Sequence, residues 1–353
     1  MESYIFPSVI ESNNYEIKNV ASDLLHGMKF YEDDLGYIIG YLALSEGISP
    51  NKTINSYPEE LDYRLLSKAG MLIAHMNNPM PKYLVTGFPY SIFHVNKRKA
   101  EDILSGQHQI TYDPAPFDNE GLPQMITTKV AHAEVIPEIE ACSIAARKGD
   151  LKMDGNFFMV SIGYGTFEAV LSTPKGLVYR TIASLAGLRY AINLAIKEIA
   201  KTFYLGLRSE QQFDVAFREG SIILNRQRLD ISEIRRRSLQ RYYRDVISPV
   251  LRNVWKDDDF KATRNMILTG GGALYKDLVD CFVDDFEILN VQTVDDPLKF
   301  ASKGYCIKAL ENASGDKDAA LGLDIGNSTT VVTLYPTSIN EVGNQEPVQN
   351  YAP

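Results

Sequence analysis

The chain has 353 residues, of which 45% are hydrophobic, and its formal net charge is -9 at pH 7. A chain of this length can bury a full core and is expected to build two domains. The acidic balance argues against bare nucleic acid or an anionic membrane as a direct partner. No apolar run is long enough to span a membrane, and the N-terminus lacks the basic region of a signal peptide. The three cysteines lack the spacing of metal ligands, so we expect a reduced, cytoplasmic protein.

The first half of the chain reads as an alternation of strands and helices. Residues 15–80 mix short strands with helices, and the basic run 96–99 fits either a solvated helix face or, less well, a contact patch. The expected strands are 4–10 and 82–89, the expected helices are 60–76, 96–104 and 139–148, and residues 107–136 are expected to form a hairpin.

The second half begins with a strand, a turn and a strand over residues 157–172. Long helices are expected at about 185–205 and 230–256. The second of these carries an arginine-rich face, which suits solvation or intramolecular ion pairs and, as an alternative, a protein partner (Arg235, Arg236, Arg237, Arg241 and Arg244). A buried strand then breaks into a glycine loop, with a helix starting near Tyr275. Residues 311–320 are small, polar and charged, which is typical of a linker.

Residues 321–335 have the pattern of a strand, a tight turn and a second strand. An apolar run carries Asp324 into the turn at residues 326–329, and the β-branched run 330–334 leaves it. Backbone amides at such a turn can form an anion-binding nest, and a carboxylate beside it can hold a cation or its waters. The same residues also suit an ordinary hairpin with a polar turn. A polar tail, 336–353, follows.

The chain contains an internal repeat in rotated order. Residues 323–334 align without a gap with 160–171, and residues 83–87 align with 266–270. In the middle of the chain, the hairpin segment 160–171 comes before the strand segment 266–270. The other hairpin segment, 323–334, comes after its strand segment, 83–87. If the chain ends were joined, both pairs would have the same order and nearly the same spacing. This indicates two similar α/β domains, with the first hairpin of one domain moved to the C-terminus, which proteins tolerate when their termini lie close together.

These features resemble the actin, chaperone and sugar-kinase ATPase superfamily, and most closely the plasmid-segregating bacterial actins of the ParM type in circularly permuted order. The resemblance extends over essentially the whole chain. The matching segments are Asp324-Ile-Gly326-Asn-Ser-Thr-Thr330, Phe6-Pro-Ser-Val9, Thr86-Gly-Phe-Pro89, Val135-Ile-Pro-Glu138, Ser161-Ile-Gly-Tyr-Gly-Thr166, Ser184 to Gly187 and Thr269-Gly-Gly-Gly272.

The resemblance implies an α/β actin-like fold of two ribonuclease-H-like domains around a nucleotide cleft. Domain I would comprise residues 1–150 and 300–353, and domain II would comprise residues 151–299. Within domain I, residues 15–80 would form a smaller subdomain, 321–335 the permuted first strands, and 311–320 the permutation linker.

The resemblance also implies a site for ATP, with GTP as an alternative, and for Mg²⁺. The two hairpin turns would close on the phosphates, and the glycine loop would lie against the adenosine. Asp324 would hold the metal through water, and Glu138 would orient the attacking water. As alternatives, Glu138 is a first-turn helix acid and the glycine loop a structural turn. The expected cofactor-binding residues are Gly326, Asn327, Ser328, Thr329, Thr330, Ser161, Gly163, Tyr164, Gly165, Thr166, Gly187, Gly270, Gly271 and Gly272.

Two positions depart from the family pattern. The second hairpin usually carries an acid for the hydration shell of the metal, and this chain has Ser161 there. Many relatives place a lysine shortly after the first hairpin, where this chain has Val331 and Val332. Hydroxyl groups and Mg²⁺ would therefore have to hold the β-phosphate, and hydrolysis could be slower.

The function that the resemblance implies is a filament-forming ATPase that polymerises on binding nucleotide and drives plasmid DNA segregation by hydrolysis. Its partners would be further copies of itself and a DNA-binding adaptor protein of a plasmid partition system, without direct contact to nucleic acid or membrane. One alternative is a structural filament with weak hydrolysis, which Ser161 suggests. A small-molecule kinase of the same fold fits less well, because such enzymes usually take their base from the acid that is missing here.

Overall fold

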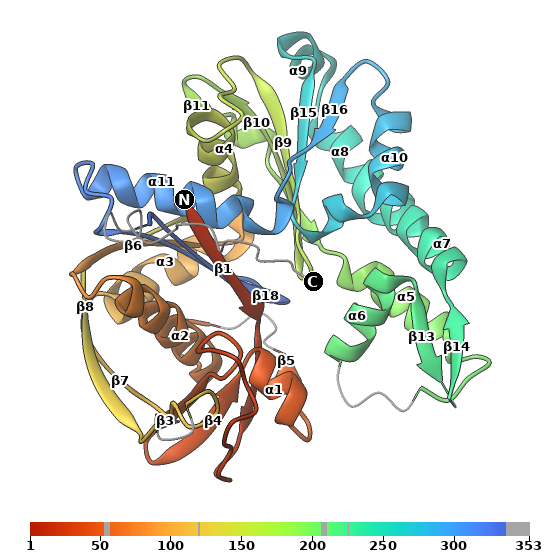
Figure 1. The fold of residues 1–353 in the computed structure, drawn as a ribbon. Coiled ribbons are helices and arrows are strands. Elements are labelled where there is room, and N and C mark those ends of the chain that lie inside the picture. The colour runs from red at the N-terminus through yellow and green to blue at the C-terminus, as the bar shows by residue number, and fades with distance from the viewer. Residues whose placement is uncertain (53–56, 119–120, 206–209, 225, 337–353) are drawn as a thin grey trace, which may run out of the picture.

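The computed structural model describes residues 1–336, apart from 53–56, 119–120, 206–209 and 225. Two α/β halves face each other, and each is built around its own sheet (Figure 1). The first half holds a ten-stranded sheet and the second half a six-stranded sheet, with a separate two-stranded ribbon. The expected polar tail lies outside the described residues from 337 onward. Within the part of the chain that is described, no helix is long and apolar enough to cross a membrane.

The first sheet takes its strands from both ends of the chain. Hairpin β17–β18 lies between β1 and β6, antiparallel to β1 and parallel to β6. The hairpin can sit there because Leu321, Leu323, Val331 and Val332 are all fully buried, as a strand covered on both faces requires. The order is β1 (Glu2–Pro7), β18 (Thr329–Leu334), β17 (Ala320–Ile325), β6 (Lys82–Phe88), β8 (Gln124–Pro137), β7 (Gly106–Tyr112), β3 (Lys29–Glu32), β4 (Leu35–Ile39), β2 (Val9–Ser12) and β5 (Asn51–Lys52).

The second sheet repeats the arrangement of the first five strands of the first sheet. Its order is β11 (Gly176–Leu177), β10 (Thr166–Thr173), β9 (Phe157–Ile162), β15 (Asn265–Thr269) and β16 (Asn290–Thr293), with β12 (Ala183–Ala186) paired to β10. In both sheets two antiparallel pairings are followed by two parallel ones. Strands β17 and β18 therefore occupy in the first sheet the positions that β9 and β10 occupy in the second.

Helices α4 (Glu138–Lys148) and α11 (Phe300–Asn312) connect the two halves. One buried core contains residues of both helices together with Val85 from β6 and Met159 from β9. The two helices approach so closely that a Cβ atom at Gly304 would lie 1.9 Å from the carbonyl oxygen of Ala141. Gly304 is therefore required for this contact.

The remaining helices cover the outer faces of the sheets and build the second half's outer part (Figure 1). Helix α2 packs against β17 and β18, where Gly70 lies against Leu323. The elements are α1 (Tyr41–Glu46), α2 (Leu61–Asn77), α3 (Tyr90–Leu104), α5 (Arg189–Ile199), α6 (Glu210–Glu219), the ribbon β13 (Ser221–Leu224) and β14 (Gln227–Asp230), α7 (Ser232–Tyr242), a π-helical turn (Tyr243–Ile247), α8 (Ser248–Val254), α9 (Asp257–Ala262), α10 (Lys276–Asp285) and three 3-10 turns (Tyr179–Thr181, Gly271–Leu274 and Pro297–Lys299).

Most expected elements are confirmed. The strand expected at 4–10 is instead two strands, β1 and β2, separated at Ser8, and the helix expected at 185–205 is wrong at both ends. Residues Ala183–Ala186 form β12, and α5 runs only from Arg189 to Ile199. The physical reason for the later start is the edge of β10: β11 pairs only with its last two residues, and β12 satisfies the hydrogen bonds of Thr166 to Ala169 on the same edge.

The segment expected to be a linker, 311–320, is a short turn between a helix and a strand. Helix α11 extends to Asn312, and β17 begins at Ala320. The turn passes through positive φ at Ser314 (54°) and Gly315 (89°), and Lys82 donates a hydrogen bond to the carbonyl of Asp318. Its polar composition reflects an exposed connection that is tied to the sheet.

The arginines of α7 are engaged within the molecule. Arg236 pairs with Glu233, Arg237 with Glu198, and Arg241 with Asp245. Arg244 also pairs with Asp245, and Arg235 donates to the carbonyls of Phe217 and Arg218. These contacts favour the interpretation that the arginines form ion pairs within the molecule over the alternative that they form a docking face for a protein partner.

The close contact of α4 and α11 predicts the effect of a single methyl group. Gly304→Ala should destabilise the protein by about 2 kcal/mol, because the new Cβ would overlap the Ala141 carbonyl and push the helices apart. Gly155→Ala is the matched control, since a Cβ there would meet no atom within 4 Å. Urea denaturation of the three proteins measures the difference, and equal midpoints would contradict the packing described.

Candidate functional site

A cavity lies where the two halves meet, lined by the turns of the two central hairpins. Residues Asp324 to Thr329 line it from the first half, and Ser161 and residues 163–166 from the second. The two turns approach so closely that a Cβ at Gly165 would lie 2.6 Å from the side-chain oxygen of Asn327. The cavity is therefore bounded by two polar turns from equivalent positions of the two sheets.

The first turn is held by the end of strand β1. The Ser8 N–H donates to the carbonyl of Ser328 at 3.0 Å, and the Ser8 and Thr330 hydroxyls are 2.9 Å apart. Ser8 and Thr330 are both fully buried. Thr330, which we expected to bind the cofactor, thus supports the turn from behind, whereas Gly326, Asn327, Ser328 and Thr329 line the cavity.

The second turn is held by the N-terminus of α5. The N–H groups of Gly187, Leu188 and Arg189 donate to the carbonyls of Gly165, Gly163 and Tyr164 at 2.9, 3.0 and 2.9 Å. A Cβ at Gly187 would lie 2.5 Å from the Gly163 carbonyl oxygen. Gly187 is thus needed for the close approach of strand, turn and helix, and it does not itself line the cavity.

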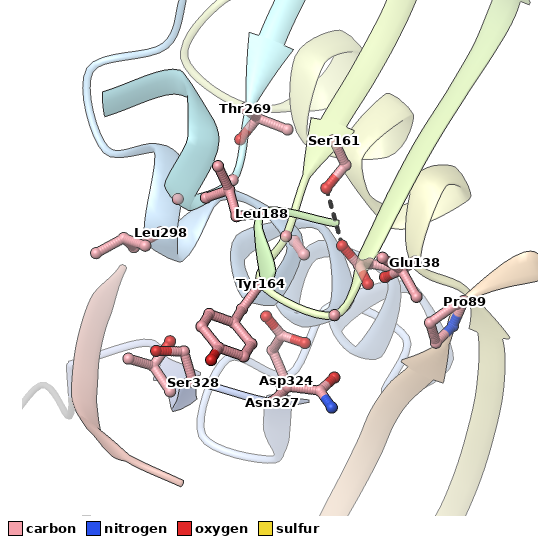
Figure 2. Close-up of a pocket in the computed structure, with 18 of the residues that line it drawn as sticks. Pro89, Glu138, Ser161, Tyr164, Leu188, Thr269, Leu298, Asp324, Asn327 and Ser328 are labelled. Carbon is pink, nitrogen blue, oxygen red and sulfur yellow. Dashed lines mark hydrogen bonds between the residues drawn. The ribbon is translucent and has the colours of Figure 1, made fainter. Parts of the chain in front are cut away.

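Tyr164, at the tip of the second turn, points across the cavity. Figure 2 shows its ring extending toward Ser328 and Asp324. The residue is 7% exposed and belongs to the buried core of the second half.

Glu138 and Asp324 approach the cavity from the first half. Glu138 is the first residue of α4, and the Ser161 hydroxyl donates to its Oε1 at 2.9 Å (Figure 2). Burial raises the pKa of Glu138, and the Ser161 hydroxyl partly opposes this rise. Burial and the nearby Glu138 raise the pKa of Asp324 well above its usual range. Two carboxyl groups thus share a poorly solvated site that a cation would stabilise.

A third carboxyl group, Glu168, was missed in the sequence. It lies on β10, directly opposite Ser161 on β9, and it is 1% exposed. Burial, with the neighbouring Glu138 as the second cause, raises the pKa of Glu168 to about 8. The acid that the family pattern places at position 161 is therefore absent, but an acid stands on the adjacent strand.

The three residues of the glycine loop, 270–272, have two different roles. Gly270 has a φ of 78° and lies under Ile162, whose carbonyl oxygen would be 2.6 Å from an added Cβ. Gly270 and Gly271 line the cavity. Gly272 instead packs on the side chain of Ile162, where a Cβ would come within 2.2 Å of Cγ2.

The cavity is also lined by residues that no motif predicted. They are Leu188, Asp214, Arg218, Leu274, Tyr275 and Leu298. The Ser328 hydroxyl donates to Asp214 Oδ2 at 2.7 Å, so helix α6 of the second half also touches the first turn. The cavity therefore combines polar turns and carboxyl groups with apolar side chains, a further acid and an arginine.

The arrangement suits a ligand with a charged end and a flat end. Small polar turns can present amides and hydroxyls to an anion such as a phosphate, and the carboxyl groups suit an accompanying cation. No group of three metal-ligating side chains converges among the described residues. The residues present therefore fit Mg²⁺, which is usually held by one or two carboxylates, phosphate oxygens and water.

Comparisons with known proteins show the fold of this chain. Residues 1–138 match the sequence profile of the family "Actin like proteins N terminal domain". No curated protein matches the chain. The structure is similar to that of the pCBH ParM non-polymerisable quadruple mutant, with a TM-score of 0.68 and 18% identity over 88% of this chain and 92% of that one. The chain has the actin-like fold.

Two further structures have the same fold. The 15-stranded ParM filament from Clostridium botulinum has a TM-score of 0.66 and 17% identity over 87% of this chain and 92% of that one. The archaeal actin homologue Ta0583 in complex with ADP has a TM-score of 0.61 and 17% identity over the same shares, 87% and 92%. The expected α/β actin-like fold is therefore confirmed.

The raised carboxyl pKa values predict how stability depends on pH. The pKa of Glu168 is about 8 when folded, compared with an ordinary 4.5, so the folded state binds the extra proton between these values. The contribution of the Glu168 carboxyl group to stability is fully present below about pH 4.5 and is lost as the pH rises through about 8. The nucleotide-free protein should therefore lose several degrees of Tm between pH 5 and pH 8.

Glu168→Gln should reduce this loss, because the amide carries no charge at any pH. Glu138 and Asp324 remain in the variant, so the loss should not vanish. Glu233→Gln is the control: Arg236 lowers the pKa of Glu233, which stays ionised over this range. Thermal unfolding at low salt tests the difference, and parallel curves for wild type and Glu168→Gln would contradict the assignment.

Proposed function

We propose that this chain is a filament-forming actin-like nucleoside triphosphatase that polymerises on binding nucleotide. Its nucleotide would be ATP, with GTP as the alternative, together with Mg²⁺. The observation that carries the proposal is the meeting of two equivalent hairpin turns on one cavity that also contains Glu138 and Asp324. In support, structures of the same fold include a ParM filament and an archaeal actin homologue with ADP.

The residues of this chain suggest how the reaction would proceed. The turns at 326–329 and 163–166 would hold the phosphates between the two halves. Asp324 would hold Mg²⁺ through water, and the metal would offset the negative charge of the phosphates. Ser161 fixes Glu138 by a hydrogen bond, and Glu138 would accept a hydrogen bond from the attacking water. Its raised pKa makes it a better proton acceptor than an ordinary glutamate.

The other end of the cavity would take the nucleoside. Gly271 has no side chain on the side of Leu188 and Leu298, so that a flat ring can lie against its backbone. Leu188, Leu274 and Leu298 supply apolar contacts. Asp214 and Arg218 also line the cavity.

We also propose that the chain is a circular permutant of an actin-like protein. The supporting observation is that β17 and β18, from the C-terminus, hold in the first sheet the place of β9 and β10 in the second. Domain I would be residues 1–150 and 300–353, and domain II residues 151–299, since all strands of each sheet fall within these limits. Helix α2 would belong to the main part of domain I rather than to the smaller subdomain, because it packs on β17 and β18.

The cellular role that we propose is plasmid DNA segregation, with a DNA-binding adaptor protein linking the filament to DNA. The alternative is a scaffold filament with weak hydrolysis, and the observation that favours it is the absence of an acid at Ser161. Glu168 on the neighbouring strand reduces the weight of that absence. Turnover of nucleotide by assembled protein distinguishes the two roles.

Polymerisation can be measured by light scattering and sedimentation of purified protein. We expect assembly with Mg-ATP or Mg-GTP and little without nucleotide, because closure on the phosphates would fix the relative position of the two halves. The control is Asp324→Ala, which should bind the metal–nucleotide complex more weakly and raise the concentration needed for assembly. Absence of assembly at high protein concentration with both nucleotides would refute the filament proposal.

Glu138→Gln tests the proposed water-orienting role. Nucleotide binding should persist, whereas phosphate release should slow by about a hundredfold, because the amide cannot accept a proton from the water. Glu140→Gln, two residues further along α4, is the matched control, since Glu140 does not line the cavity. Phosphate release at saturating nucleotide gives the rates, and unchanged turnover in Glu138→Gln would remove Glu138 from this role.

A further inference from the structure

Glu168 joins the two halves of the molecule at the inner end of the cleft. Its Oε1 accepts a hydrogen bond of 2.6 Å from the backbone N–H of Tyr90. Glu168 lies on β10 in the second sheet, whereas Tyr90 is the first residue of α3, which follows β6 of the first sheet. The bond therefore crosses from one half to the other.

The carboxyl group reaches a place where two helices of the first half begin. Strands β6 and β8 are parallel neighbours whose ends, Phe88 and Pro137, pair with each other. Helix α3 follows β6 and helix α4 follows β8, so both N-termini lie at the same edge of the sheet. The N–H of Ile139, the second residue of α4, also favours the ionised form of Glu168. Two helix N-termini make this edge favourable for an anion.

The surroundings of Glu168 otherwise oppose a charge. Its second oxygen, Oε2, is buried and has no hydrogen-bond partner within the described part of the chain. The groups that face it are Glu138 and Cys142 from α4, Tyr305 from α11, Ser184 from β12 and Ser161 from β9. A buried carboxyl group with one oxygen lacking a partner lowers the stability of the folded protein. The bond from Tyr90 to Glu168 therefore suggests a role beyond packing.

Another contact between the halves lies at the first hairpin turn. There the Ser328 hydroxyl donates to Asp214. That bond joins a turn to an outer helix, and ligand phosphates at the turn would compete for the same hydroxyl. The Glu168–Tyr90 bond instead joins a central strand to a helix start. The ring centroids of Tyr90 and Tyr179 lie 6.5 Å apart across the same junction.

We propose that Glu168 is a positioning residue that latches α3 of the first half to β10 of the second, so that closure of the cleft is transmitted to α3. The coupling to nucleotide rests on the proposed function, but the latch itself does not, because it is a bond between two residues of the chain. Helix α3 carries the exposed basic residues Arg98 and Lys99, so a shift of its N-terminus would also displace that surface.

The Tyr90 amide gives a direct readout. The N–H of the first residue of a helix has no partner within the helix, so protection of this amide depends on Glu168. Pro89–Tyr90 is the only Pro-Tyr step in the sequence. Labelling proline with ¹³C at the carbonyl carbon and tyrosine with ¹⁵N therefore isolates the Tyr90 signal in an NMR spectrum of the full chain.

In the nucleotide-free protein, Glu168→Ala should speed hydrogen exchange of the Tyr90 amide by at least about tenfold. Glu168→Gln keeps an acceptor and should restore exchange to near the wild-type rate. The Tyr90 shift should titrate with pH in the wild type and stay constant in Glu168→Gln. Asp214→Ala, which removes the acceptor of the Ser328 hydroxyl, should leave the Tyr90 exchange unchanged.

Unchanged exchange of Tyr90 in a folded Glu168→Ala protein would overturn the latch. If Glu168→Ala does not fold, the titration in the wild type and in Glu168→Gln decides, and identical pH profiles would overturn the proposal. Addition of Mg-ADP should slow Tyr90 exchange in the wild type but not in Glu168→Ala. If Mg-ADP binds to the wild type but does not change the exchange of the Tyr90 amide, the proposed coupling of nucleotide to α3 is overturned. Failure of Mg-ADP to bind would instead count against the proposed function and leave the nucleotide-free result standing.

Discussion

The contact between the two hairpin turns is the constraint on which the site depends. Asn327 from the first turn lies against Gly165 from the second, where no Cβ could be accommodated. Each turn is fixed from behind by a different device: Ser8 at the end of β1 holds the first, and the N-terminal amides of α5 hold the second. Because both turns are supported by buried strands, the cavity between them is defined by the sheets rather than by mobile loops.

The meeting of the two halves also brings three acidic side chains together in a buried region. Asp324 comes from the first sheet, Glu138 from the helix that joins the halves, and Glu168 from the second sheet. Their raised pKa values show that the site without ligand carries uncompensated electrostatic cost. A cation between phosphates and carboxylates would reduce that cost, so ligand binding and closure of the halves would favour each other.

The sequence predicts the centre of the fold well because that centre follows simple patterns. The hairpins at 157–172 and 321–335 have buried β-branched runs around small polar turns, and the repeat between them anticipates the equivalence of β17–β18 with β9–β10. The sequence does not reveal β12, because pairing at the edge of β10 overrides a local helical pattern. Glu168 was missed because one acid in an apolar strand carries no motif. Asp214 and Arg218 were missed because only the tertiary packing of α6 brings them to the cavity.

The position of Glu168 suggests why the chain can lack an acid at Ser161. Residues opposite each other on adjacent strands lie close together on the same face of a sheet, and Glu168 is opposite Ser161. A hydroxyl at 161 leaves room for a hydrogen bond to Glu138, whereas a carboxylate there would add a third negative charge next to Glu138 and Glu168. An acid on the neighbouring strand stays close to Glu138 and reaches the start of α3. In this way an acid near the phosphate site also becomes a tie between the two halves.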